Sequence, residues 1–303
     1  MFTGIHFLLT YTCLFECDHC FLYCGPGAEG VFTLSRIKGV LEEARRMGTV
    51  EWIYFEGGEP FLYYPVMLEG LRSARAMGFY TGVVSNGYWA TTREDAAAWL
   101  KPLRDLGVAD LSLSDDAYHF GEEQETPART ALAAALDLGL EAMTICIDHP
   151  RVTPGPAGKG EKGEPIVGGG VKFRGRAADK LSEGLPRRRW SSLVECPHED
   201  LRDPGRVHVD PFGHVFICQG LSLGNFLQAP LSDLLGNYDP STHPVCGPLA
   251  EGGPARLVER YGLLHEEGYV DECHLCFEAR RELIGRFPEF LAPGQVYGRA
   301  NTG

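Results

Sequence analysis

The sequence predicts an α/β fold, a partial (β/α)6 barrel of the TIM type followed by a small α+β domain. Apolar, strand-like runs begin near Ile5, Glu51, Phe79, Ala109, Glu141 and, less clearly, Ile166. They recur about every thirty residues, the length of a strand, a helix and two loops. Six units are fewer than the eight that close a TIM barrel, so we expect a barrel open on one side. Shorter elements follow, and we place the domain boundary between 1–190 and 191–303.

Helix signals lie between the strand-like runs. Apolar residues at Ile37, Val40, Leu41 and Ala44 recur at helical spacing, and Gly48 is the expected stop. This pattern predicts an amphipathic helix with one face against the sheet.

Two further helices are predicted from their first residues. Thr91 and Glu94 have the spacing of a capping box. Thr126 and Pro127 predict an N-cap and a proline at the first helical position, and Gly139 closes that helix.

Composition and charge exclude several classes of protein. The 303 residues have a net charge of −13, which argues against nucleic acid as the main partner. No apolar run reaches membrane-spanning length, and the N-terminus lacks the features of a signal peptide. We therefore expect a cytoplasmic protein that binds no membrane. In such a chain, ten cysteines with short spacings favour metal binding over disulfides.

Three of these cysteines, Cys13, Cys17 and Cys20, follow the first strand-like run at spacings of four and three. Three thiolates can bind a cubane iron–sulfur cluster and leave one of its four irons free for a substrate or cofactor. A zinc site that recruits His19, a set of core cysteines and a disulfide framework are the alternatives.

The same segment, together with Gly57-Gly58-Glu59-Pro60, resembles the radical S-adenosylmethionine (radical SAM) superfamily. The resemblance implies a (β/α)6 partial barrel and a [4Fe–4S] cluster on the three cysteines, whose open iron binds SAM. It implies that Gly57, Gly58, Glu59 and Pro60 contact SAM, and that a reducing partner such as flavodoxin or ferredoxin supplies the electron. In this family SAM is split to a 5′-deoxyadenosyl radical.

Polar residues follow the third and fourth predicted strands, where a barrel of this type has its active site. Ser85 and Asn86 are predicted to bind the cofactor, with a plain turn as the alternative. Ser114 and Asp116, by resemblance, reach the ribose or the methionyl end of SAM; the alternative is a helix cap. His119, which follows them, is more simply a structural hydrogen bonder.

The segment from Pro150 to Gly170 is rich in glycine and proline. We expect a long loop, either a lid over the barrel or a tolerated insertion. A Gly-Arg-Ala sequence follows at 175–177, in which Arg176 has no evident role beyond pairing with a carboxylate.

The C-terminal region contains a second group of cysteines. Residues 206–210 and 214–218 have the pattern of a β-hairpin, 223–226 that of a turn and 231–235 that of a short helix. Cys273 and Cys276 open another helix. With Cys196 and Cys218 they resemble the twitch domain, the shortened SPASM domain, which implies an auxiliary [4Fe–4S] cluster. A zinc site on the same four thiols is the alternative.

Three cysteines remain outside these sets. Cys24, Cys146 on the fifth strand and Cys246 in a loop are ordinary thiols by default. Cys146 is the one catalytic candidate, as a hydrogen-atom donor, if its side of the strand faces the barrel interior.

Three functions explain these features to different extents. The first is a radical SAM enzyme of the dehydrogenase type, an oxidoreductase that removes a hydrogen atom from a small molecule while the auxiliary cluster accepts an electron. The second is a maturase that cross-links or epimerises a ribosomal peptide; the short segment before Cys13 leaves little room for the peptide-recognition module that many maturases have. The third, an electron carrier, leaves residues 57–60 without a role. No motif identifies the substrate.

Overall fold

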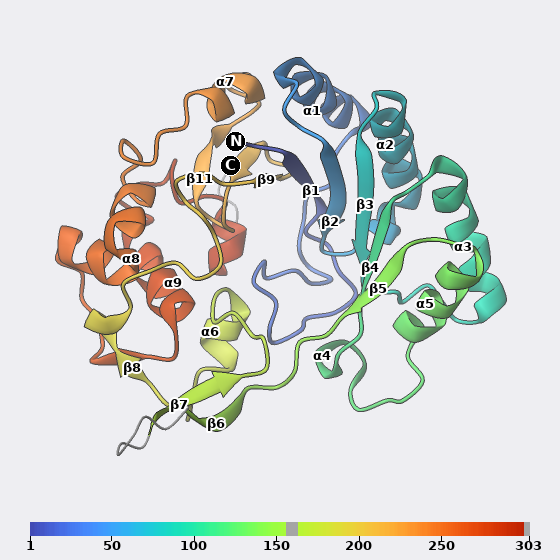
Figure 1. The fold of residues 1–303 in the computed structure, drawn as a ribbon. Coiled ribbons are helices and arrows are strands. Elements are labelled where there is room, and N and C mark those ends of the chain that lie inside the picture. The colour runs from blue at the N-terminus through green and yellow to red at the C-terminus, as the bar shows by residue number, and fades with distance from the viewer. Residues whose placement is uncertain (156–162, 300–303) are drawn as a thin grey trace. The chain divides into compact units, whose positions relative to one another are not determined.

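The computed structural model describes residues 1–155 and 163–299 (Figure 1). The chain divides into two compact units. The first comprises Met1–Glu16, Cys24–Cys146 and Asp203–Tyr238, and the second comprises Cys17–Tyr23, Ile147–Arg202 and Asp239–Gly303.

The first unit is built on an eight-stranded sheet with the order β11-β10-β9-β1-β2-β3-β4-β5. Strands β1 to β5 and β9 run parallel, and β10 and β11 are antiparallel to their neighbours. The strands are β1 (Gly4–Thr10), β2 (Trp52–Gly57), β3 (Tyr80–Ser85), β4 (Asp110–Ser114), β5 (Ala142–Ile145), β9 (Arg206–Val209), β10 (His214–Phe216) and β11 (Ser222–Asn225). The α/β class with a mostly parallel sheet is confirmed.

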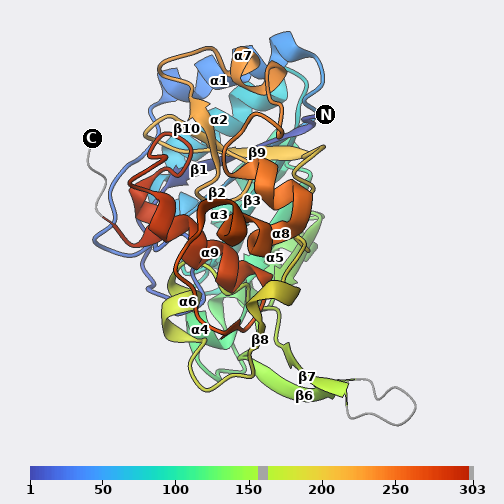
Figure 2. The same ribbon diagram turned by 90° about the vertical axis from the view of Figure 1, so that its left-hand side faces the viewer.

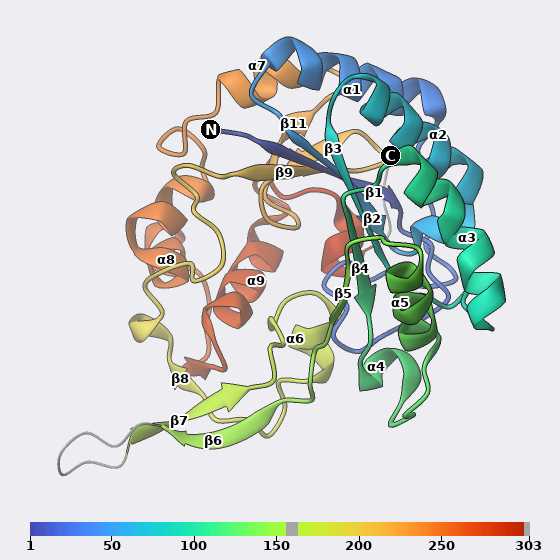
Figure 3. The ribbon, with the colours of Figure 1, turned by 45° about the vertical axis from the view of Figure 1, so that its right-hand side comes forward.

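Helices cover one face of this sheet (Figures 1 and 3). They are α1 (Leu34–Met47), α2 (Tyr64–Ala76), α3 (Arg93–Leu106), α5 (Pro127–Asp137) and α7 (Leu231–Gly236). The 3-10 turn η1 (Pro60–Tyr63) follows β2, and the short helix α4 (Ala117–Phe120) follows β4. Phe7 of β1 stacks on Phe55 of β2 at a centroid distance of 5.1 Å, and Gly70 lets α2 approach Phe55 closely. Alternate residues of β1 and β2 therefore point toward the helices, and those between them point to the opposite face.

The predicted helix signals are largely confirmed. Residues Ile37, Val40, Leu41 and Ala44 form the buried side of α1, and Gly48 ends the helix in a left-handed conformation (φ 70°). The capping box before α3 lies one residue later than predicted. The N-cap is Thr92, which has an extended backbone and whose hydroxyl accepts the N–H of Asp95.

The second unit consists of short elements. They are β6 (Arg151–Gly155), β7 (Gly163–Gly168), α6 (Arg176–Lys180), β8 (Arg188–Arg189), η2 (Trp190–Ser192), α8 (Cys246–Tyr261), β12 (Gly268–Tyr269), α9 (Glu272–Leu283) and η3 (Gly294–Tyr297). Strands β6 and β7 pair as an antiparallel hairpin that extends away from α8 and α9 (Figure 2).

The prediction that a sixth strand near Ile166 joins the parallel sheet is wrong. Ile166 lies in β7 and pairs with Thr153 of β6. The predicted long loop is therefore a hairpin in its described part, and residues 156–162 lie outside the described residues. The antiparallel pairing satisfies the backbone of both arms locally, without a crossover helix.

On the edge of β1 opposite β2 lies β9, the first strand of the predicted hairpin of residues 206–218. Gly4 to Phe7 pair in parallel with Arg206 to Val209. The predicted turn at 223–226 is also wrong over most of its length, since Ser222–Asn225 form β11 and pair with β10. Within the described residues, no helix has both the length and the apolar character needed to cross a bilayer.

Candidate active site

The Gly57-Gly58-Glu59-Pro60 turn is fixed to the end of β1. The N–H of Gly58 donates to the carbonyl of Thr10 (2.7 Å), and the N–H of Glu59 donates to that of Thr12 (2.9 Å). A Cβ on Gly58 would lie 2.1 Å from the Thr12 oxygen, and Gly57 has a φ of 124°. These glycines therefore allow close contact with the protein backbone, in addition to any approach to a ligand that the sequence predicts.

The carboxylate of Glu59 is fully buried and joins this turn to the end of β3. It accepts hydrogen bonds from the N–H of Phe61 (2.9 Å), the hydroxyl of Ser85 (2.9 Å) and the N–H of Asn86 (2.8 Å). Burial raises the pKa of Glu59 to about 7, although these three donors act in the opposite direction. Glu59, Ser85 and Asn86 thus form one buried network, and their contact with SAM stays a prediction.

The same network reaches the first cysteine. The side-chain amide of Asn86 donates to the sulfur of Cys13 (3.7 Å), and the N–H of Phe15 donates to the same sulfur (3.4 Å). Cys13 is buried, three residues after the end of β1. Donors directed at a sulfur stabilise its thiolate form, the form that binds iron.

Cys17 and Cys20 belong to the second unit, where Arg176 binds their backbone. Its guanidinium donates to the carbonyl of Cys17 (2.8 Å), and its N–H donates to that of Cys20 (2.9 Å). Gly175 has a φ of 60°, and a Cβ there would lie 2.4 Å from the Cα of Phe21. Arg176 therefore positions the cysteine segment, a role that sequence reasoning missed; the Gly-Arg-Ala sequence was the available signal.

Asp116 is the N-cap of α4, one of the alternatives for this residue. Its carboxylate accepts the N–H groups of Tyr118 (3.1 Å) and His119 (3.2 Å) and lies 2.8 Å from Nδ1 of His119. Ser114 is the last residue of β4. Their predicted contacts with SAM are not tested by this geometry.

The predicted C-terminal ligands lie in different local environments. Cys273 and Cys276 are in the first turns of α9, which Asp271 caps by accepting the N–H of His274 (2.7 Å). Cys218 lies two residues after β10 in the first unit. We keep all four cysteines as predicted ligands.

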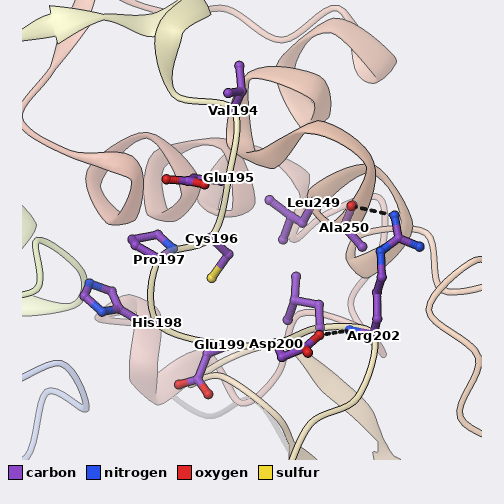
Figure 4. Close-up of a pocket in the computed structure, with 11 residues that line it drawn as sticks. Val194, Glu195, Cys196, Pro197, His198, Glu199, Asp200, Arg202, Leu249 and Ala250 are labelled. Carbon is purple, nitrogen blue, oxygen red and sulfur yellow. Dashed lines mark hydrogen bonds between the residues drawn. The ribbon is translucent and has the colours of Figure 1, made fainter.

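Cys196 lines a pocket of about 480 Å³ in the second unit. Figure 4 shows its sulfur pointing into this pocket. The guanidinium of Arg202, which also lines the pocket, donates a hydrogen bond to the carbonyl of Ala250 (2.8 Å). His198 and Glu199 also line the pocket, whereas Cys273 and Cys276 do not.

The three remaining cysteines also have defined places. Cys146 is exposed, immediately after β5, and Cys24 is buried. Cys246 is the first residue of α8, so the prediction of a loop at this position is wrong.

Comparison with known proteins supports the reading of the N-terminal segment. Residues 7–121 match the family model described as the Radical SAM superfamily. The "Putative peptide biosynthesis protein YydG" of Bacillus subtilis (strain 168) is 27% identical over 107 residues, 35% of this chain and 34% of that protein. The "Tungsten-containing aldehyde ferredoxin oxidoreductase cofactor-modifying protein" of Pyrococcus furiosus is 30% identical over 101 residues, 33% of this chain and 27% of that protein. The chain thus matches about a third or less of the length of these curated relatives.

One solved structure is similar in fold over most of the chain. The crystal structure of BtrN in complex with AdoMet and 2-DOIA has a TM-score of 0.51 and 14% sequence identity, and the match covers 78% of this chain and 83% of that one. At this identity the likeness concerns the fold alone.

Proposed function

We propose that this chain, in which residues 7–121 form a Radical SAM superfamily domain, is an enzyme that binds a [4Fe–4S] cluster through Cys13, Cys17 and Cys20. When bound to SAM and reduced, such a cluster supplies the electron that cleaves SAM to a 5′-deoxyadenosyl radical. We propose further that this radical removes a hydrogen atom from a small-molecule substrate.

The observation that supports this proposal best is the environment of the Cys13 sulfur. Two N–H donors, from Phe15 and from the Asn86 side chain, are directed at it. A buried thiol with two donors fits a thiolate that binds iron better than it fits an ordinary core cysteine, which has no need of them.

The other residues of the first unit would act by placing this thiolate. The N–H groups of Gly58 and Glu59 fix the backbone of Thr10 and Thr12, and the Glu59 carboxylate accepts the N–H of Asn86. We propose that SAM binds beside this turn and contacts the polar residues at the ends of β3 and β4. These are Ser85, Asn86, Ser114 and Asp116.

The proposal includes a second cluster on Cys196, Cys218, Cys273 and Cys276, in a twitch-like domain. Four thiolates leave no open iron, so this cluster would accept an electron from a substrate radical or support the substrate site. Oxidation of the substrate, as by a dehydrogenase, is the net reaction that we propose.

A peptide substrate is the second candidate. The match to a Bacillus subtilis protein whose name refers to peptide biosynthesis favours it. The match to a cofactor-modifying protein favours a different kind of substrate. A short reading frame for a precursor peptide next to this gene would favour the peptide, and neighbouring genes for sugar or cofactor enzymes would favour the small molecule.

The test of the common chemistry is reductive cleavage of SAM. The full chain is reconstituted anaerobically with iron and sulfide, reduced with dithionite and mixed with SAM, and 5′-deoxyadenosine is measured by liquid chromatography. We expect 5′-deoxyadenosine to form at a rate proportional to bound iron. Its absence from a protein loaded with iron would overturn the proposal.

A further inference from the structure

Three polar side chains gather on the face of the main sheet that is turned away from the helices. His6 lies on β1, Glu56 on β2 and His208 on β9. They alternate along their strands with residues such as Phe7 and Phe55, which pack together toward the helices. The strand pairing places His6 beside His208 in register, so residues from opposite parts of the chain meet here.

Their donor atoms lie close enough together to bind a single ion. Nδ1 of His6 lies 3.3 Å from one oxygen of Glu56, and Nε2 of His208 lies 3.3 Å from the other. A charge-assisted hydrogen bond has a length of about 2.7–2.9 Å, so both separations are too long for a strong one. Two ligands that are each about 2.1 Å from a tetrahedral zinc ion are about 3.4 Å apart.

The rings are oriented before any ion binds. His6 stacks on Tyr54 at 4.6 Å, and His208 stacks on Phe216 at 5.7 Å. Nδ1 of His6 is buried and makes no hydrogen bond to any described residue, although it faces Glu56. One donor atom from each of the three residues lies within 4.8 Å of the others. Rings that are already held in place lower the cost of ordering a metal site.

We propose that His6, Glu56 and His208 bind a divalent transition-metal ion, separate from any iron–sulfur cluster. Two imidazoles and one carboxylate are a ligand set of catalytic zinc and of non-haem iron(II) sites, and three protein ligands leave a coordination position for water or for an oxygen of a substrate. Nδ1 of His208 has no partner among the described residues, and a water molecule would satisfy it.

The proposal is tested on the full chain with its clusters reconstituted, using zinc as the probe. One equivalent of Zn²⁺ is added, excess metal is removed, and zinc is measured by mass spectrometry and by X-ray absorption at the zinc edge. We expect about one zinc per chain, with nitrogen and oxygen ligands, imidazole scattering and no sulfur. Zinc bound through sulfur, or no retained zinc, would overturn the proposal without any variant.

Two substitutions identify the ligands. Glu56→Gln and His208→Gln should each weaken zinc binding on the order of a hundredfold or more, because each removes one of three ligands. His265→Gln changes an exposed histidine of the second unit and should leave zinc binding unchanged. Wild-type zinc affinity in both ligand variants would contradict the proposal. The result does not depend on SAM cleavage, so it can fail while the proposed function stands.

Discussion

The two regions around Cys13 and Cys196 surround a thiol in different ways. Cys13 follows a central strand, and its sulfur accepts hydrogen bonds from the N–H of Phe15, two residues later, and from Asn86, which directly follows β3. Cys196 lies in an irregular segment, and its sulfur points into a pocket of about 480 Å³ (Figure 4). Parallel strands bring their carboxyl ends to one edge, so the first arrangement follows from regular structure. The second lies in a segment that forms neither helix nor strand.

This difference suggests different dependence on metal. The turn of residues 57–60 and the end of β3 stay in place through backbone hydrogen bonds and the buried Glu59. The second unit has short elements, and a metal centre with four thiolates contributes a large part of the stability of such a region. We therefore expect loss of the N-terminal ligands to abolish chemistry, and loss of the C-terminal ligands to affect structure as well.

The largest effect is expected from replacing Cys13, Cys17 and Cys20 together by Ala. Iron per chain should fall from about eight to about four after reconstitution, and SAM cleavage should be lost. Iron analysis and 5′-deoxyadenosine measurement check this. Ser191→Ala, which changes an exposed residue outside the predicted ligand sets, is the control. If the triple variant still made 5′-deoxyadenosine, these cysteines would not bind the cluster that cleaves SAM.

Replacement of Cys273 and Cys276 by Ala tests the predicted C-terminal cluster in the same way. About half of the iron should again be lost, but SAM cleavage by the first cluster should remain. Once a substrate is known, product should fall further than 5′-deoxyadenosine. If the ratio of product to 5′-deoxyadenosine were the same as in the wild type, the second cluster would neither accept the electron nor support the substrate site. If the variant is unfolded, as circular dichroism would show, the thiolates are structural.

Glu59→Ala should destabilise the first unit. It leaves the Ser85 hydroxyl and two buried N–H groups without their acceptor, and each unpaired donor costs about 1–3 kcal/mol. Anaerobic thermal unfolding measures the loss, with the exposed Glu51→Ala as control. SAM binding by calorimetry, at equal iron content, separates this structural role from the predicted contact.

The buried Glu59 also predicts a dependence on pH. The pKa of Glu59 is raised from 4.5 in the unfolded chain to about 7 by burial, so the folded state binds the proton more tightly. The stability that this proton provides is complete below pH 4.5 and is lost as pH rises to about 7. The stability difference between wild type and Glu59→Ala should therefore be larger at pH 5 than at pH 8. If the stability difference were the same at pH 5 and pH 8, the three hydrogen-bond donors would offset the effect of burial on the pKa of Glu59.

The smallest effect is expected for Asn86→Ala. The backbone N–H of residue 86 still binds Glu59, but the side-chain donor to the Cys13 sulfur is lost. Donors to sulfur favour the reduced, more negative cluster, so its reduction potential should become more negative. A redox titration followed by electron paramagnetic resonance measures the shift, with Asn237→Ala as control. An unchanged potential would mean that the amide does not act on the cluster.

Local patterns predicted much of the first unit. Helical spacing gave the buried face of α1, and the pair Thr126 and Pro127 gave the start of α5. The cysteine motif and residues 57–60 identified the candidate site because both have fixed spacing next to a strand. These features depend on residues that are close together in the sequence, so they can be recognised in a single sequence.

Features that depend on distant contacts were missed. Ile166 has the apolar character of a sheet strand, yet its partner is Thr153 in a hairpin. Arg176 binds the carbonyl of Cys17, and His208 lies beside His6, through contacts between residues far apart in sequence. No local pattern specifies such pairs, since spacing within a strand or helix carries no information about which distant segment lies next to it.

The pairing of β1 with β9 has a consequence for synthesis on the ribosome. Strand β1 can pair with β2 as soon as Gly57 has emerged, but its other edge is completed only by Arg206 to Val209. Until those residues emerge, this edge displays unpaired backbone groups, a template for association with other nascent chains. The final closure also joins segments of very large sequence separation, which slows folding. Chaperones that bind exposed strand edges would therefore be expected to raise the yield of this protein.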